Sequence, residues 1–177
     1  MASTSTGASL SGDIIALDLV LAVVTQDWFW EGSVQASIAR FLLTQGWSIR
    51  RQADTASRER GVDLIATRDD RVLAIEVKGY PASVRTAGVN RGTPKPAGQA
   101  NLQARIWYAE ALLTAILLQS RGTYTDVAVG LPNHARYRAL VDGTRSALSR
   151  LRIGIYLANE AGSVMLFLSH AQPPKPD

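Results

Sequence analysis

The stretch GVDLIATRDDRVLAIEVKG, residues 61–79, predicts two antiparallel strands joined by a tight turn. Val62 to Thr67 and Arg71 to Lys78 are short apolar runs of strand length. Asp69-Asp70 between them is typical of a polar hairpin turn. The sequence therefore predicts a β-hairpin in the first half of the chain.

Charged residues interrupt these apolar runs at one end of the expected hairpin. Residues i and i+2 project from the same face of a strand, so Glu76 and Lys78 should point together. The hairpin can bring Asp63 alongside them. Glu31 is expected on the sheet-facing side of a preceding helix, because Glu31, Val34, Gln35, Ile38 and Leu42 share one helical face. Three carboxylates and one ammonium would then converge.

The remaining elements follow from apolar periodicity and from Gly and Pro positions. We expect helices over Asp27 to Gln45, Gln99 to Gln119 and Ala135 to Leu151, the second apolar enough to be well buried. Further strands are expected over Trp47 to Arg51, Thr125 to Leu131, Ile153 to Ala158 and Val164 to Leu168. Gly79 to Gly98 is a long glycine-rich loop, a type that is usually functional or mobile. The order predicts one mixed α/β domain.

The composition of the 177 residues fits a single domain with a sizeable core, since 46% are hydrophobic. Disulfides, thiolate metal sites and thiol catalysis are excluded because the chain has no cysteine. The net charge is +4, and 16 of the 19 basic residues are arginine. This balance permits a nucleic-acid partner without requiring one.

The ends of the chain are expected to lie outside the folded domain. Residues 1–12 predict a disordered leader and residues 171–177 a flexible tail, leaving residues 13–170 as the domain. The apolar run Ile14 to Val24 is too short to span a bilayer and contains Asp18, so it is interpreted as an extra packed element. A cytoplasmic protein without a membrane partner is the expectation.

The predicted acidic group has the chemistry of a hard-metal site. Carboxylate oxygens suit Mg²⁺ or Mn²⁺, which keep several water ligands. A metal lowers the pKa of bound water, and a nearby lysine can orient or deprotonate that water. Zinc is not expected, because neither His134 nor His170 has a second histidine at ligand spacing. No phosphate-binding glycine loop of the Walker or dinucleotide type occurs.

The order of Glu31 on a helix, Asp63 on a strand and Glu76-Val77-Lys78 on the next strand resembles the PD-(D/E)xK nuclease superfamily, in particular its restriction-endonuclease-like and Mrr-like members. The resemblance covers Trp30 to about Leu131 and implies a single-domain αβββαβ core with a mixed sheet flanked by helices. The sequence departs from the motif at Val62, which replaces the proline that names it.

The resemblance implies a metal-dependent endonuclease that hydrolyses phosphodiester bonds in nucleic acid, DNA more than RNA. Asp63 and Glu76 would be metal ligands, Glu31 would complete the site directly or through water, and Lys78 would position or activate the attacking water. Gln99 resembles a glutamine that several members place beside the site, and Gln103 is a weaker candidate. A hairpin-end salt bridge between Glu76 and Lys78 is the alternative interpretation.

A basic loop beside this site is expected to bind a phosphate backbone. The candidate nucleic-acid-binding residues are Arg60, Arg85, Arg91, Lys95 and Arg105, with Arg50, Arg51 and Arg58 adding to a positive rim. Trp28, Phe29 and Trp30 could stack on bases, although such clusters more often pack in a core or a dimer interface.

Two other functions remain open on sequence grounds. The same fold could bind DNA or a partner protein without turnover. Alternatively, the long apolar helix and Ile14 to Val24 could form an oligomer interface in a protein that binds no nucleic acid. A homodimer is compatible with each of these functions.

Overall fold

The computed structural model describes residues 29–57, 59–82, 89, 92–96 and 98–169. The helices are α2 (Glu31–Thr44), α3 (Gln99–Ser120) and α4 (Ala135–Leu151). The strands are β1 (Ser48–Gln52), β2 (Leu64–Arg68), β3 (Arg71–Val77), β4 (Asp126–Pro132), β5 (Ile153–Ala158) and β6 (Val164–Leu168). Every described element matches a predicted one within a few residues. The predicted leader, the tail and the run Ile14 to Val24 lie outside the described residues.

The six strands form one mixed sheet in the order β1-β2-β3-β4-β5-β6. The β1–β2, β2–β3 and β5–β6 pairs are antiparallel, whereas β3–β4 and β4–β5 are parallel. Each parallel connection contains a helix, as a crossover requires. The prediction of an α/β fold with a mixed sheet flanked by helices is confirmed.

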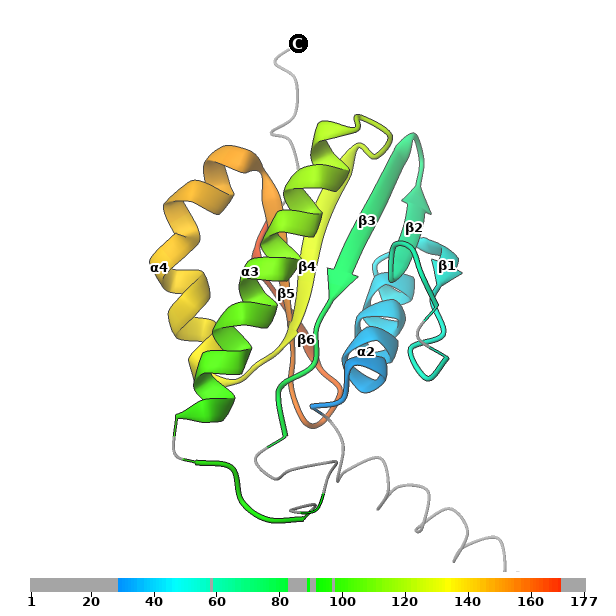
Figure 1. Ribbon diagram of the computed structural model, residues 1–177. Coiled ribbons are helices and arrows are strands. Elements are labelled where there is room, and N and C mark those ends of the chain that lie inside the picture. Colours follow the sequence, from blue (N-terminus) through cyan, green and yellow to red (C-terminus); the bar gives the residue numbers. More distant parts are fainter. Residues whose placement is uncertain (1–28, 58, 83–88, 90–91, 97, 170–177) are drawn as a thin grey trace, which may run out of the picture.

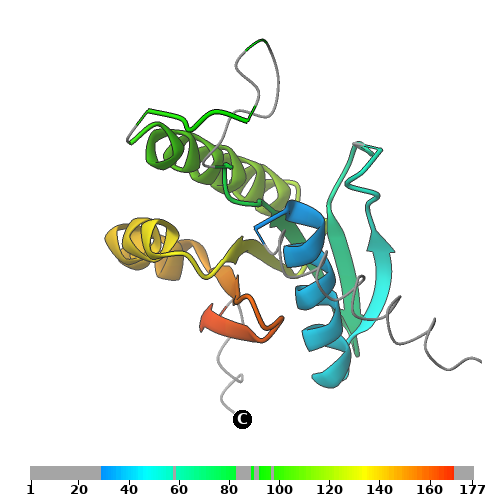
Figure 2. The same ribbon diagram turned by 90° about the horizontal axis from the view of Figure 1, so that it is seen from below.

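The helices cover both faces of this sheet (Figures 1 and 2). Helix α2 lies on one face, where Val34, Ile38 and Leu42 pack on residues of β2, β3 and β4. Helices α3 and α4 lie on the other face, over a second cluster that includes Tyr108 and Tyr137. Central strands β4 and β5 are buried along their whole length, which agrees with their continuous apolar sequence.

The predicted hairpin is confirmed, and its register positions the acidic residues. Arg68 pairs with Arg71 across the turn, where Asp69 adopts a left-handed φ of 54°. At the other end Leu64 pairs with Ile75. Asp63 therefore lies just before β2 rather than within it, beside the end of β3.

The prediction that the second long helix is well buried is wrong for much of its surface. Leu102, Ile106, Leu113, Ile116 and Leu117 are exposed, and the buried residues are Ala104, Tyr108, Ala111, Ala115 and Leu118. The helix is apolar around most of its circumference, so periodicity did not separate its two faces. Three alanines on the inner face let the helix backbone lie close to the sheet. Within the described part of the chain, no helix is both long and apolar enough to cross a membrane.

Candidate active site

The carboxyl ends of the parallel strands and the amino-terminal ends of the three helices lie at one edge of the molecule (Figure 1). Strand β3 ends there at Val77, which lies between Glu76 and Lys78. The Lys78 ammonium donates a hydrogen bond of 2.7 Å to Glu76 Oε1. The Asp63 carboxylate accepts a hydrogen bond of 2.7 Å at Oδ2 from the Val77 backbone N–H. The expected convergence of Asp63, Glu76 and Lys78 is confirmed.

The segment that carries Asp63 is fixed by contacts from two sides. The Gln35 side chain, buried on α2, donates a 2.7 Å hydrogen bond to the Asp63 carbonyl oxygen, which also accepts one from the Ala53 backbone N–H at 2.8 Å. The Arg51 guanidinium donates to the Val62 carbonyl oxygen at 2.9 Å. These bonds hold the backbone in place, so the Asp63 carboxylate is presented in a defined position.

Glu31 reaches the site because helix α2 begins against the end of β3. A Cβ atom on Gly79 would lie 2.5 Å from the Phe29 carbonyl oxygen and 2.8 Å from the Glu31 backbone nitrogen. Only glycine permits this approach of two backbones. The Tyr80 backbone N–H donates to the Phe29 carbonyl oxygen at 2.8 Å, and the buried Tyr137 hydroxyl donates to the Gly79 carbonyl oxygen at 2.8 Å.

The three carboxyl groups at this edge are electrostatically coupled. Burial raises the pKa of Asp63, and the Val77 hydrogen bond and the Lys78 and Arg51 charges offset only part of that rise. Burial, followed by the Asp63 charge, raises the pKa of Glu76. Burial also raises the pKa of Glu31, with the Lys78 charge opposing and the Asp63 charge reinforcing the change. All three carboxylates are therefore held in an environment that disfavours their negative charge.

At Lys78 the neighbouring charges outweigh the effect of burial on the pKa. Burial would lower its pKa, but the hydrogen bond to Glu76 and the charges of Glu76, Glu31 and Asp63 together raise the pKa above its ordinary value. The side chain consequently remains an ammonium at neutral pH and donates hydrogen bonds. The Lys78 and Arg51 charges face three carboxylates, which leaves an excess of negative charge that an additional cation would neutralise.

A Mg²⁺ or Mn²⁺ ion at this edge could be held by two carboxylates of the described chain but not by three. Among the described residues, no group of three His, Cys, Asp or Glu side chains is placed to hold one metal ion. Mg²⁺ in proteins is commonly bound by one or two carboxylates and several waters. Asp63 and Glu76 are the candidates for direct contact, and Glu31 is the candidate for contact through water.

The predicted glutamines do not join this acidic group. Gln99 begins α3 with an exposed side chain, and within the described residues no hydrogen bond connects that side chain to the carboxylates. Gln103 lies one turn further, where its Oε1 accepts a 3.3 Å hydrogen bond from Lys95. The predicted roles of Gln99 and Gln103 thus receive no support from the contacts seen.

The predicted basic residues that the structure describes are spread over several elements. Arg85, Arg91 and Arg58 lie outside the described residues. Arg60 is exposed, and Arg51 is bound in an ion pair with Glu59 at 2.8 Å. Arg50 donates to Thr67.

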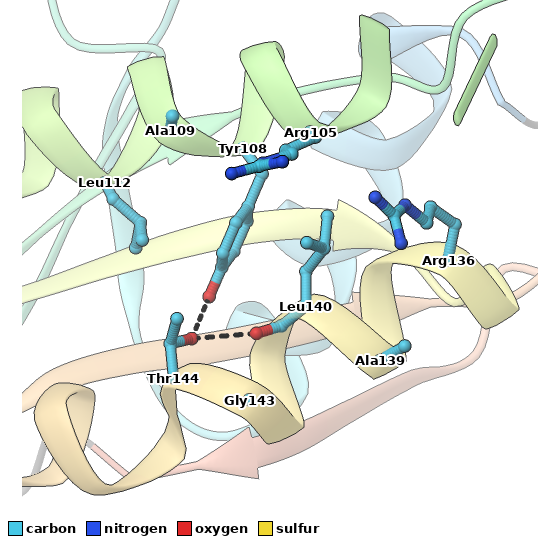
Figure 3. Close-up of a pocket in the computed structure, with 9 residues that line it drawn as sticks. All are labelled: Arg105, Tyr108, Ala109, Leu112, Arg136, Ala139, Leu140, Gly143 and Thr144. Carbon is cyan, nitrogen blue, oxygen red and sulfur yellow. Dashed lines mark hydrogen bonds between the residues drawn. The ribbon is translucent and has the colours of Figure 1, made fainter. Parts of the chain in front are cut away.

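Arg105 lines a groove between α3 and α4 (Figure 3). Arg136 extends into the same groove, and the other residues that line it are mainly apolar. Deeper in this groove the Tyr108 and Thr144 hydroxyl groups are 2.6 Å apart. Arg136 was not predicted as part of the positive surface, because its place depends on how α3 and α4 pack.

Three further residues near the site were not singled out for the roles that they have. Gln35 and Tyr137 fix the backbone at Asp63 and Gly79. The polar Gln35 within an apolar helical stripe was a usable signal, because buried amides need partners. His134 stacks on Tyr80 with 3.8 Å between ring centroids, and its Nδ1 accepts a hydrogen bond from the Arg136 backbone N–H, so it caps α4.

Comparison of the chain with protein-family models, curated proteins and solved structures finds no match.

Proposed function

We propose that the protein is a metal-dependent nuclease that hydrolyses phosphodiester bonds in nucleic acid, DNA more than RNA. The observation that carries this proposal is the convergence of Glu31, Asp63 and Glu76 on Lys78 at one sheet edge, with the pKa of every carboxyl group raised. A purely structural ion pair needs one carboxylate, and perturbed groups concentrated in one place are typical of functional sites.

The arrangement of the elements supports assignment to the restriction-endonuclease-like core. A helix, three antiparallel strands, a helix and a parallel strand follow one another from α2 to β4. Asp63 and Glu76 lie on adjacent strand ends, and Lys78 follows Glu76 by two residues, as the PD-(D/E)xK resemblance implies.

In this proposal each polar residue has a separate task. A bound Mg²⁺ or Mn²⁺ would supply charge neutralisation at the phosphate and a more acidic water. Asp63 and Glu76 would hold the metal, and the backbone bonds from Gln35 and Ala53 keep Asp63 in position. Glu31 would accept a hydrogen bond from a water at the mouth of the site.

Lys78 orients rather than deprotonates in this account. Its raised pKa keeps the proton on the side chain at neutral pH, so it can donate hydrogen bonds to the attacking water or to a phosphate oxygen. Glu76 holds that ammonium at 2.7 Å and so fixes its direction.

A non-catalytic module that binds DNA or a protein with the same fold is the second candidate. The observation in its favour is the closed Glu76–Lys78 ion pair, which satisfies both groups without any ligand. Binding with a steep salt dependence but without strand cleavage in Mg²⁺ or Mn²⁺ would select this candidate.

The test is a cleavage assay with labelled single-stranded and duplex DNA and RNA in Mg²⁺ and Mn²⁺. Lys78→Ala and Glu76→Ala should each lower the cleavage rate by about 10³-fold, the size of effect that loss of a transition-state contact produces. Asp142→Asn is the matched control, because Asp142 forms an exposed ion pair with Arg145 on α4. Undiminished cleavage by both site variants, with their fold intact by circular dichroism, would overturn the proposal.

A further inference from the structure

A small cavity of about 280 Å³ opens directly beside Glu31. Four aromatic side chains line it, and they come from three separate segments: Phe29 and Trp30 at the start of α2, Tyr80 after β3, and Trp107 on α3. Glu31 and Gly79 complete one wall, so the cavity and the proposed active site share residues. The cavity is at the lower end of the size range of ligand pockets, which suits one planar ring system.

Two of these aromatic residues have a packing role. The Phe29 and Tyr80 rings lie 5.5 Å apart, and both contact the His134 ring. Tyr80 also meets Tyr137 edge to face at 5.5 Å. These contacts account for Phe29 and Tyr80 as parts of the fold and make one side of the cavity rigid.

Packing does not account for Trp30 in the same way as for Phe29 and Tyr80, because the Trp30 side chain is 47% exposed. The indole lies over Gly32, where a Cβ atom would come within 2.4 Å of two ring carbons. A glycine at this position lets the ring lie against the first turn of α2. Trp30 also borders a second hollow, lined by Gln52 and Thr55 among others, so the indole stands between two open spaces. A large exposed aromatic surface in a concave place is typical of a binding site.

We infer that this cavity binds one unstacked nucleobase of the nucleic acid, next to the phosphate that is cleaved. The inference rests on the proposed function and specifies its substrate class as single strands or opened duplex ends. An uncharged aromatic ring is the fitting occupant, because the Glu31 carboxylate would repel a phosphate group from the cavity. A base within an intact duplex has both faces covered and cannot enter without unpairing, which costs a few kcal/mol.

An organic cation is the alternative occupant of a cavity lined by aromatic rings and one carboxylate. Aromatic cages with a carboxylate do bind quaternary ammonium groups. Competition by tetramethylammonium therefore distinguishes such a cation from a base as the occupant. Base stacking on Trp30 and Trp107 needs no net charge and tolerates any of the bases.

The experiment measures binding of a fluorescent oligothymidine in Ca²⁺ by anisotropy, so that it does not depend on cleavage. Trp30→Ala should weaken binding roughly tenfold, the loss expected when one base loses its stacking partner. Trp30→Phe should restore most of the affinity. Leu43→Ala, which removes an equally exposed apolar side chain at the far end of α2, should leave affinity unchanged.

A single abasic nucleotide moved along the oligonucleotide identifies the base concerned. At one position it should weaken wild-type binding by the same factor as Trp30→Ala, and the two changes together should cost no more than either alone. Wild-type affinity in Trp30→Ala, additive losses, or displacement of the oligonucleotide by tetramethylammonium would each overturn the inference. If the protein binds the oligonucleotide through Trp30 but does not cleave it in Mg²⁺, only the nuclease proposal is overturned. If it cleaves equally well without Trp30, only this inference is overturned. If it does not bind the oligonucleotide, both are overturned.

Discussion

Strand β3 has an ion pair at each end, and the two pairs differ in how well their charges are matched. At its start the Arg71 guanidinium makes two hydrogen bonds, of 2.7 and 2.8 Å, to both carboxylate oxygens of Asp126. Thr125 adds a bond of 2.9 Å, and the Arg71 guanidinium lies 5.3 Å from the centre of the Trp47 ring. At its end Lys78 bonds to Glu76, while Glu31 and Asp63 lie near enough to shift its pKa.

The difference separates a charge pair that joins two strands from a charge group to which we assign metal binding in the proposed function. At the first end the Arg71 guanidinium binds the Asp126 carboxylate in fork-like geometry, which ties β3 to β4. At the second end negative charge exceeds positive charge, and burial raises the pKa of Glu31, Asp63 and Glu76. Excess buried charge lowers stability, as functional sites commonly do.

The largest effect on stability is expected at the matched pair. Asp126→Asn should lower the free energy of unfolding by about 2–3 kcal/mol, because Arg71 loses a charged acceptor in a buried position. Glu76→Gln should change the same quantity by less than about 1 kcal/mol, because it removes a carboxylate from a group with excess negative charge. Urea unfolding at neutral pH measures both. Equal losses from the two variants would mean that both pairs serve mainly to stabilise the fold.

A smaller effect is expected on how stability depends on pH, through the raised pKa of Glu76. A carboxyl group whose pKa is raised in the folded state binds its proton more tightly there than in the unfolded chain, so stability falls as pH rises through the raised pKa. The penalty is absent below the ordinary pKa of 4.5 for Glu76 and grows as pH rises above it. Without metal, Glu76→Gln should therefore gain up to about 1 kcal/mol on wild type at pH 7, and this gain should vanish towards pH 4. A difference independent of pH would contradict the assigned pKa direction.

Much of the fold and part of the site follow from local patterns in the chain. Alternation and the Asp69-Asp70 turn predict the hairpin, and the period of two in a strand predicts that Glu76 and Lys78 lie together. Helical spacing places Glu31 toward the sheet. These features depend on neighbours within one hairpin or one helix, which is why the sequence reveals them.

The features that the sequence does not reveal depend on packing between distant segments. The sequence does not separate the exposed face of α3 from its buried face, because both faces are apolar and only the fit to the sheet distinguishes them. Tyr137 reaches Gly79 across 58 residues. Trp107 joins Trp30 at one cavity only because α3 and α2 flank the same strand end on opposite faces.

The proposed function requires that the end of β3 binds a divalent metal and that its start does not. Calorimetric titration with Mn²⁺ tests this requirement most directly. Wild-type protein should bind Mn²⁺, and the site variants Asp63→Asn and Glu76→Gln should each bind it at least tenfold more weakly. The control variant Asp126→Asn, measured at a temperature where it is folded, should bind Mn²⁺ as wild type does. The same isotherm for all four proteins, or no binding by the wild type, would contradict the account.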